Sequence, residues 1–202
     1  MKHALLAAAI ALPAFTASAG ALAHIAIFNG TLTSAAEGDP TNTSVGTGTV
    51  KITLDDHDFT MRIETSFSGL TGTTTAAHIH CCTASANSGS AGVATTLPSF
   101  PDFPAGVTSG DYDRTFDMTE ATSWNTAFVN ANGGTLGTAF SALATAFEQE
   151  RAYLNIHTSY RGGGEIRGFL APAPVPEPET YALFMTGLGL LAFGAMKRRP
   201  AR

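Results

Sequence analysis

The 202-residue chain has only 13% charged residues and 21 glycines, and once its two distinctive ends are set aside about 150 residues remain, the size of one domain. This composition suits short strands with many turns better than long helices. Between residues 24 and 174, 14 acidic residues face 6 basic ones, a net charge of about −8. An acidic body excludes nucleic acid as a partner, because phosphates need clustered lysine and arginine.

The N-terminus has the pattern of a secretory signal peptide. Lys2 is followed by an almost uninterrupted apolar run at 4–12 and then by small residues of the kind that signal peptidase recognises. The run is too short to cross a hydrocarbon core of about 30 Å. We predict that residues 1–23 are removed by cleavage after Ala23, with Ala19 as the alternative site.

Apolar and polar residues then alternate in several short segments, which is typical of strands. The predicted strands lie at 25–32, 50–54, 59–67, 76–80, 112–118, 152–158 and 165–170. The polar turn at 55–58 makes a hairpin of the second and third, and long loops fill 83–110. Helical spacing of apolar residues marks 123–130 and 138–150.

This order of elements predicts an all-β domain over residues 24–171. We expect an antiparallel β-sandwich, either immunoglobulin-like or a Greek key like that of superoxide dismutase, with one or two short inserted helices.

The C-terminal tail at 172–202 has three parts in a fixed order. A proline-rich linker comes first and contains Val175, Pro176, Glu177 and Pro178. An uncharged apolar segment follows at 181–196, roughly 24 Å long as a helix, and predicts a short transmembrane span. A basic end closes the chain with Lys197, Arg198 and Arg199, which would stay in the cytoplasm.

The tail resembles the PEP-CTERM sorting signal of Gram-negative bacteria. The resemblance implies that an exosortase-type membrane protease removes the tail after transient anchoring in the inner membrane. It also implies a destination at the cell surface or in the extracellular matrix, where exopolysaccharide is a candidate partner.

Four motifs occur in order along the body of the chain: Gly69-Leu70, Ala77-His78-Ile79-His80, the segment 152–158 and the segment 163–168. Together they resemble the CHRD domain, named from chordin, over about residues 25–170. One departure is that Cys81 and Cys82 follow the His-x-His pair, where the family often has glycine and small residues. The resemblance implies a fold and brings no defined activity.

Three histidines are predicted to share the outer face of two strands. His78 and His80 are two residues apart, so they point to one side of a strand while Ile79 points to the other. In the predicted strand at 152–158, Ile156 and His157 are consecutive, so their side chains point to opposite faces. If the isoleucines face the core and the strands are neighbours, three imidazoles converge, and such a set suits zinc or copper.

The two cysteines are adjacent in sequence, so they cannot staple distant parts of the fold. Free thiols, a bond between the neighbours, an intermolecular bond and metal ligation all remain open for Cys81 and Cys82. A thiolate from either could complete the histidine site and would favour Cu(I). The alternative role of the histidines is structural, through hydrogen bonds to loop backbone.

Glu165 and Arg167 lie on one face of the last strand, where a cross-strand ion pair is a simpler interpretation than a general base or metal ligand. No nucleophile elbow, phosphate-binding loop or zincin helix occurs in the sequence. We therefore predict a non-catalytic exported protein, a structural or adhesive module of the cell surface or biofilm matrix. The alternative is an extracytoplasmic copper- or zinc-binding protein that uses His78, His80 and His157.

Overall fold

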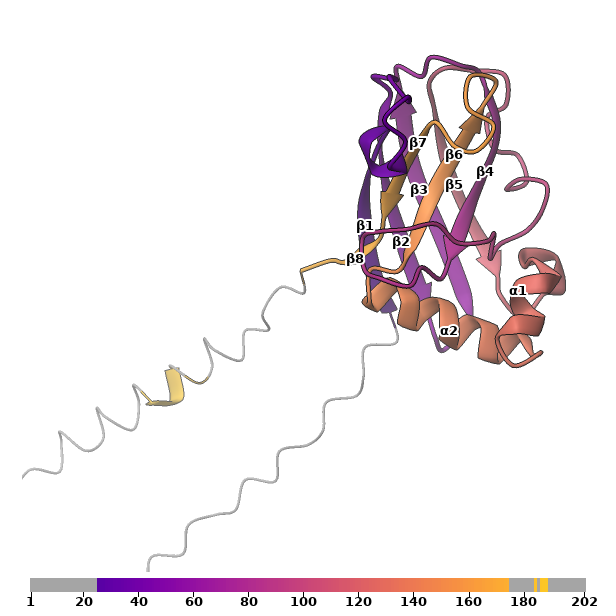
Figure 1. The fold of residues 1–202 in the computed structure, drawn as a ribbon. Helices are drawn as coiled ribbons and strands as arrows, with labels where there is room; N and C mark the ends of the chain where they lie inside the picture. The colour runs from indigo at the N-terminus through magenta and orange to yellow at the C-terminus, as the bar shows by residue number, and fades with distance from the viewer. Residues whose placement is uncertain (1–24, 175–183, 185, 189–202) are drawn as a thin grey trace, which may run out of the picture.

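The computed structural model describes residues 25–174, 184 and 186–188 and shows an antiparallel β-structure with a few short helices (Figure 1). Its strands are β1 (Ile25–Thr33), β2 (Thr47–Asp55), β3 (Thr60–Ser68), β4 (Thr74–Cys81), β5 (Gly110–Asp117), β6 (Ala152–Thr158), β7 (Ile166–Phe169) and β8 (Ala171–Pro172). The helices are η1 (Ala35–Glu37) and η2 (Ala121–Ser123), both 3-10, and α1 (Thr126–Ala131) and α2 (Leu136–Glu148).

All of these strands belong to one sheet in the order β4-β6-β7-β1-β2-β3-β5, with β8 paired to β1. The predicted antiparallel all-β class is confirmed. The predicted division into two stacked sheets is not what the structure shows, because β1 pairs with β2 along its whole length and with β7 at Thr33. This shared strand makes the sheet continuous, and the sheet curls into a half-barrel (Figure 1).

The two edges of the curled sheet are linked by backbone rather than by a strand pair. Leu70 N–H donates to the carbonyl of Thr108 at 3.1 Å, and Thr74 N–H donates to that of Val107 at 2.8 Å. These bonds join the start of β4 and the residues before it to the residues before β5. The long loop at 82–109 therefore closes the side of the half-barrel that the strands leave open.

The core fills the inside of the curl with alternate residues of the strands. Ile52, Ile63 and Leu154 are fully buried, as the alternation predicted. Helix α2 covers one end of the half-barrel (Figure 1), where Phe147 packs on Phe28 with ring centroids 5.2 Å apart. The predicted helix at 138–150 is confirmed, and it starts two residues earlier because Thr135 caps the first turn.

Glu165 holds together loops that are distant in sequence. Its carboxylate is fully buried and accepts hydrogen bonds from Ser44 Oγ at 2.5 Å, Thr71 N–H at 2.5 Å, Gly72 N–H at 3.0 Å and Thr158 Oγ1 at 2.6 Å. Burial opposes ionisation, but these four donors together outweigh it and keep the pKa of Glu165 below its ordinary value of 4.5.

The cross-strand ion pair predicted at Glu165 and Arg167 is not formed by Glu165, whose carboxylate accepts four neutral donors instead. Arg167 Nε donates to the carbonyl of Ala36 at 2.6 Å and lies 3.7 Å from Glu37 Oε2, so its ion-pair partner comes from η1. The spacing of Glu165 and Arg167 could not indicate this arrangement. The donors to Glu165 come from loops that approach it only in the folded chain.

The predicted transmembrane segment at 181–196 falls mainly on residues outside the described part of the chain. Ala23, the 175–178 motif and the basic end at 197–199 also lie outside it. Among residues 25–174, 184 and 186–188, no helix combines the length and apolar character that a membrane crossing requires.

Candidate metal centre

The alternation of side chains along β4 and β6 places three histidines on one face of the sheet. Ile79 and Ile156 are fully buried in the core, and Ile79 is the register partner of Leu154 in the antiparallel β4–β6 pair. His78, His80 and His157 consequently point to the opposite, outer face, as predicted. We call these three residues the histidine triad.

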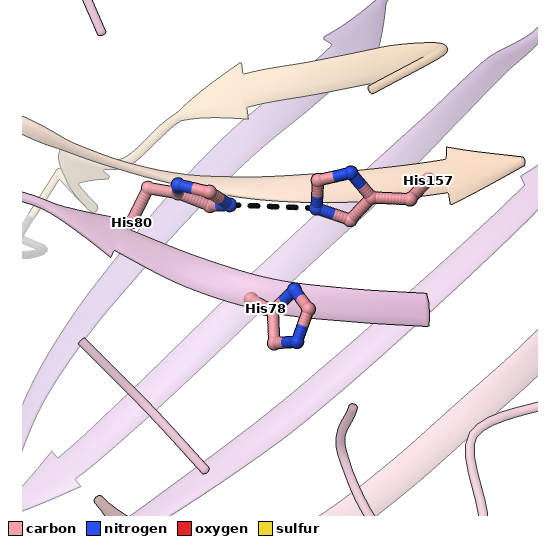
Figure 2. A group of neighbouring side chains, drawn as sticks. All are labelled: His78, His80 and His157. Atoms are coloured by element: carbon pink, nitrogen blue, oxygen red, sulfur yellow. Dashed lines mark hydrogen bonds between the residues drawn. The ribbon is translucent and has the colours of Figure 1, made fainter. Parts of the chain in front are cut away.

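The imidazole rings of the histidine triad turn toward one another (Figure 2). His80 Nε2 lies 3.4 Å from His157 Nε2, and each of the three rings offers one nitrogen within 4.8 Å of the other two. Nitrogens bound at 2.0–2.1 Å to one tetrahedral ion are roughly 3.3–3.4 Å apart. The His80–His157 distance already has this value, and the His78 nitrogen lies within 4.8 Å of both.

Each ring is fixed by a backbone carbonyl on its far side. His78 Nε2–H donates to Pro98 O at 2.7 Å, His80 Nδ1–H to Ala91 O at 2.9 Å, and His157 Nδ1–H to Gly162 O at 3.0 Å. A carbonyl can only accept, so these nitrogens carry the protons of the neutral rings. The remaining nitrogens present lone pairs to the centre of the triad. Such backbone anchoring is the usual way in which metal-ligating histidines are oriented.

The outer face is not open to solvent at this point. The loops at 91–98 and 160–164 lie over it, so His78 is 6% exposed and His80 8% exposed. Burial lowers the pKa of His78 to about 4 and also lowers the pKa values of His80 and His157. All three rings are therefore neutral near pH 7, the form that binds metal ions.

Aromatic packing holds His80 in place. Its ring stacks on Tyr153, its register partner in β6, with centroids 5.0 Å apart and an interplanar angle of 5°. The Tyr153 hydroxyl in turn accepts a hydrogen bond from the N–H of Ala91, the residue whose carbonyl anchors His80. The ring orientation is thus determined by both strands and by the loop above them.

Cys81 and Cys82 are not part of this cluster. They form a disulfide with each other, one of the alternatives that the sequence left open. Cys81 follows His80 in β4, so its side chain lies on the core face, where it is buried. Among the described residues, the metal-ligand group at this site consists of the three histidines.

His57 lies in the turn between β2 and β3 and does not belong to the triad. Its ring contacts the Asp58 carboxylate at 2.7 Å, and the Asp55 side chain accepts the His57 backbone N–H at 3.0 Å. The side chains of His57 and Asp58 are 71% and 67% exposed. This arrangement is a solvated turn, which makes His57 a suitable comparison residue for the triad.

Two polar residues on this side of the sheet, Asn155 and Glu37, were not predicted to be part of the site. Asn155 is the register partner of His78, and Glu37 comes from η1, more than a hundred residues earlier. The N-x-H spacing of Asn155 and His157 places both on one face of β6 and could have indicated the first. Nothing in the local sequence around Glu37 indicates its position.

Comparisons with known proteins identify two regions of the chain. The family model described as the CHRD domain matches residues 28–170, which contain the whole triad. The model described as the PEP-CTERM protein-sorting motif matches residues 174–199. No curated protein and no solved structure matches the chain.

Proposed function

Because the chain belongs to the CHRD family and carries the PEP-CTERM sorting motif, we propose that it is an exported protein whose histidine triad binds a copper or zinc ion. The sorting motif supports export and C-terminal processing. The observation that carries the metal proposal is the set of three neutral imidazoles, each anchored by a carbonyl and each directing a lone pair to one point. Without a cation, the His80 and His157 lone pairs would face each other at 3.4 Å.

Removal of two triad histidines is expected to abolish metal binding. We expect near-stoichiometric copper or zinc in the protein recovered after export, and none in the His78→Ala/His80→Ala variant, because one remaining imidazole cannot hold the ion. Plasma mass spectrometry of the purified proteins measures this. The exposed His57→Ala variant is the matched control and should keep its metal. Metal-free native protein, even after copper loading, would contradict the proposal.

The second candidate function is the non-catalytic structural or adhesive role at the cell surface or in the exopolysaccharide matrix. The matched sorting motif supports it, and so does the polar outer face of β1, β2, β3 and β5, which forms a shallow hollow of about 770 Å³. In this case the histidine triad would have a structural role, because its hydrogen bonds to backbone carbonyls hold the two loops over β4 and β6. Native protein that stays metal-free would favour this role.

Processing at both ends is a separate expectation. Signal peptidase should remove residues 1–23, and an exosortase-type protease should remove the tail beyond about Pro176, after transient anchoring on the periplasmic side of the inner membrane. Intact-mass spectrometry of protein secreted by a host with this machinery should show both losses. A full-length mass would contradict export and sorting.

A further inference from the structure

Three buried acceptor atoms without hydrogen-bond partners lie on or beside the outer face of β4 and β6. They are His78 Nδ1, Asn155 Oδ1 and Glu37 Oε1. Asn155 is 2% exposed, and the side chain of Glu37 is 8% exposed. Buried acceptors are normally paired, because an unpaired one loses its bonds to water and gains nothing in return. Their concentration here indicates that a partner belongs at this place.

The two unpaired oxygens both lie close to Gly164, at a position where only glycine fits. A Cβ on Gly164 would come within 2.4 Å of Asn155 Oδ1 and within 2.7 Å of Glu37 Oε1. The two oxygens are therefore separated by no more than the sum of these distances. Gly164 also has φ +130°, which disfavours any other residue. We call Asn155 Oδ1 and Glu37 Oε1 the oxygen pair.

One member of the oxygen pair, Asn155, lies next to the histidine triad. Asn155 is opposite His78 in the β4–β6 register and two residues before His157 on the same face of β6. Its amide Nδ2 donates to Gly163 O at 3.3 Å, next to the Gly162 carbonyl that anchors His157. With its amino group committed to the loop, the amide presents Oδ1 as a free acceptor.

A site with three histidine ligands leaves one position of a tetrahedral ion for water or another small ligand. A metal-bound water has two hydrogens to donate, and the oxygen pair offers two acceptors without donors when the Glu37 carboxyl is ionised. Resting on the metal proposal above, we propose that the triad-bound ion keeps an open coordination position, that Asn155 and Glu37 hold the water in it, and that small anions exchange with this water.

A hollow of about 440 Å³ gives access to this side of the site. It is lined by Glu37, Arg161 and the glycines at 162–164, among others, and these glycines carry the carbonyls that hold His157 and Asn155. A Cβ on Gly162 or Gly163 would meet nothing within 4 Å, so these two glycines border open space. A small molecule entering here meets Glu37 and the loop that covers the triad.

The test is an azide titration of the copper(II)-loaded protein, followed by the azide-to-copper charge-transfer band. Azide cannot donate hydrogen bonds to the oxygen pair, whereas water can. Asn155→Leu removes an acceptor, and Glu37→Gln replaces a carboxylate by a neutral amide, so each change weakens the hydrogen bonds that hold the water. Both variants should therefore bind azide about two- to tenfold more tightly than the native protein. Asn29→Leu, on the exposed outer face of β1, is the matched control and should bind azide like the native protein.

The outcomes separate this inference from the metal proposal. Absence of copper in the native protein would refute the proposed function itself. Copper that binds but gives no azide band would show that the position is closed. Equal azide affinities in the native protein and both variants would show that the oxygen pair does not hold the water. Glu37→Gln keeps the size of the side chain, so it remains informative if Asn155→Leu fails to fold.

Discussion

Replacement of Glu165 by alanine is expected to lower the free energy of unfolding by roughly 3–5 kcal/mol. The change removes a buried carboxylate and leaves its donors unpaired, among them the Ser44 and Thr158 hydroxyls, which are 6% and 1% exposed. These donors belong to the segments before β2, before β4 and at the end of β6, so the variant loses the connection between them. Chemical denaturation measures the effect.

Glu64→Ala is the matched control, because Glu64 lies on β3 and its partner Lys51 is 44% exposed. The loss of this surface pair should cost about 1 kcal/mol or less. Glu165→Gln should fall between the two, since it keeps the volume but replaces one acceptor with a donor. If Glu165→Ala costs no more than Glu64→Ala, the stabilising role of the carboxylate is refuted.

The pH dependence of the same site has a defined sign. The folded-state pKa of Glu165 lies below 4.5, so the unfolded chain binds the proton more readily than the folded one. The stabilisation is fully present above pH 4.5 and is lost as the pH falls through the folded-state pKa. The stability difference between the native protein and Glu165→Gln should therefore shrink on acidification.

The strands and the facing of the triad could be predicted from sequence because both follow from the two-residue period of a strand. Ile79 and Ile156 in the core require His78, His80 and His157 on the other side, and only the adjacency of β4 and β6 had to be assumed. The alternation of apolar and polar residues within each strand therefore determined which side chains could lie on the same face.

The contacts that make a candidate site of these three neighbouring histidines could not be predicted in the same way. The anchoring carbonyls of Pro98, Ala91 and Gly162 belong to loops without periodicity, and any residue supplies a carbonyl. Glu37 reaches the site only because β1 continues into η1 above β7. The single curled sheet depends on the same long-range pairing of β1, which no local pattern encodes.

Metal binding is expected to stabilise the fold by about 4 kcal/mol when free ion is present at about a thousandfold excess over its dissociation constant. For a domain of this size that corresponds to a rise of roughly 10 °C in Tm. The reason is that His157 lies 77 residues after His80, so the complete triad exists only in the folded chain. In the unfolded chain, His78 and His80 still bind the metal ion weakly, and this reduces the stabilisation of the folded state.

Thermal unfolding with and without copper or zinc, and again after a chelator, measures this linkage. His57→Ala should show the native shift, whereas His78→Ala/His80→Ala should show none. An equal shift in the double variant would place the ion elsewhere, for instance at the exposed acidic turn around His57. A shift confined to proteins with an intact triad would tie the ion to β4 and β6, because only a ligand bound to the folded site can raise the stability of that site.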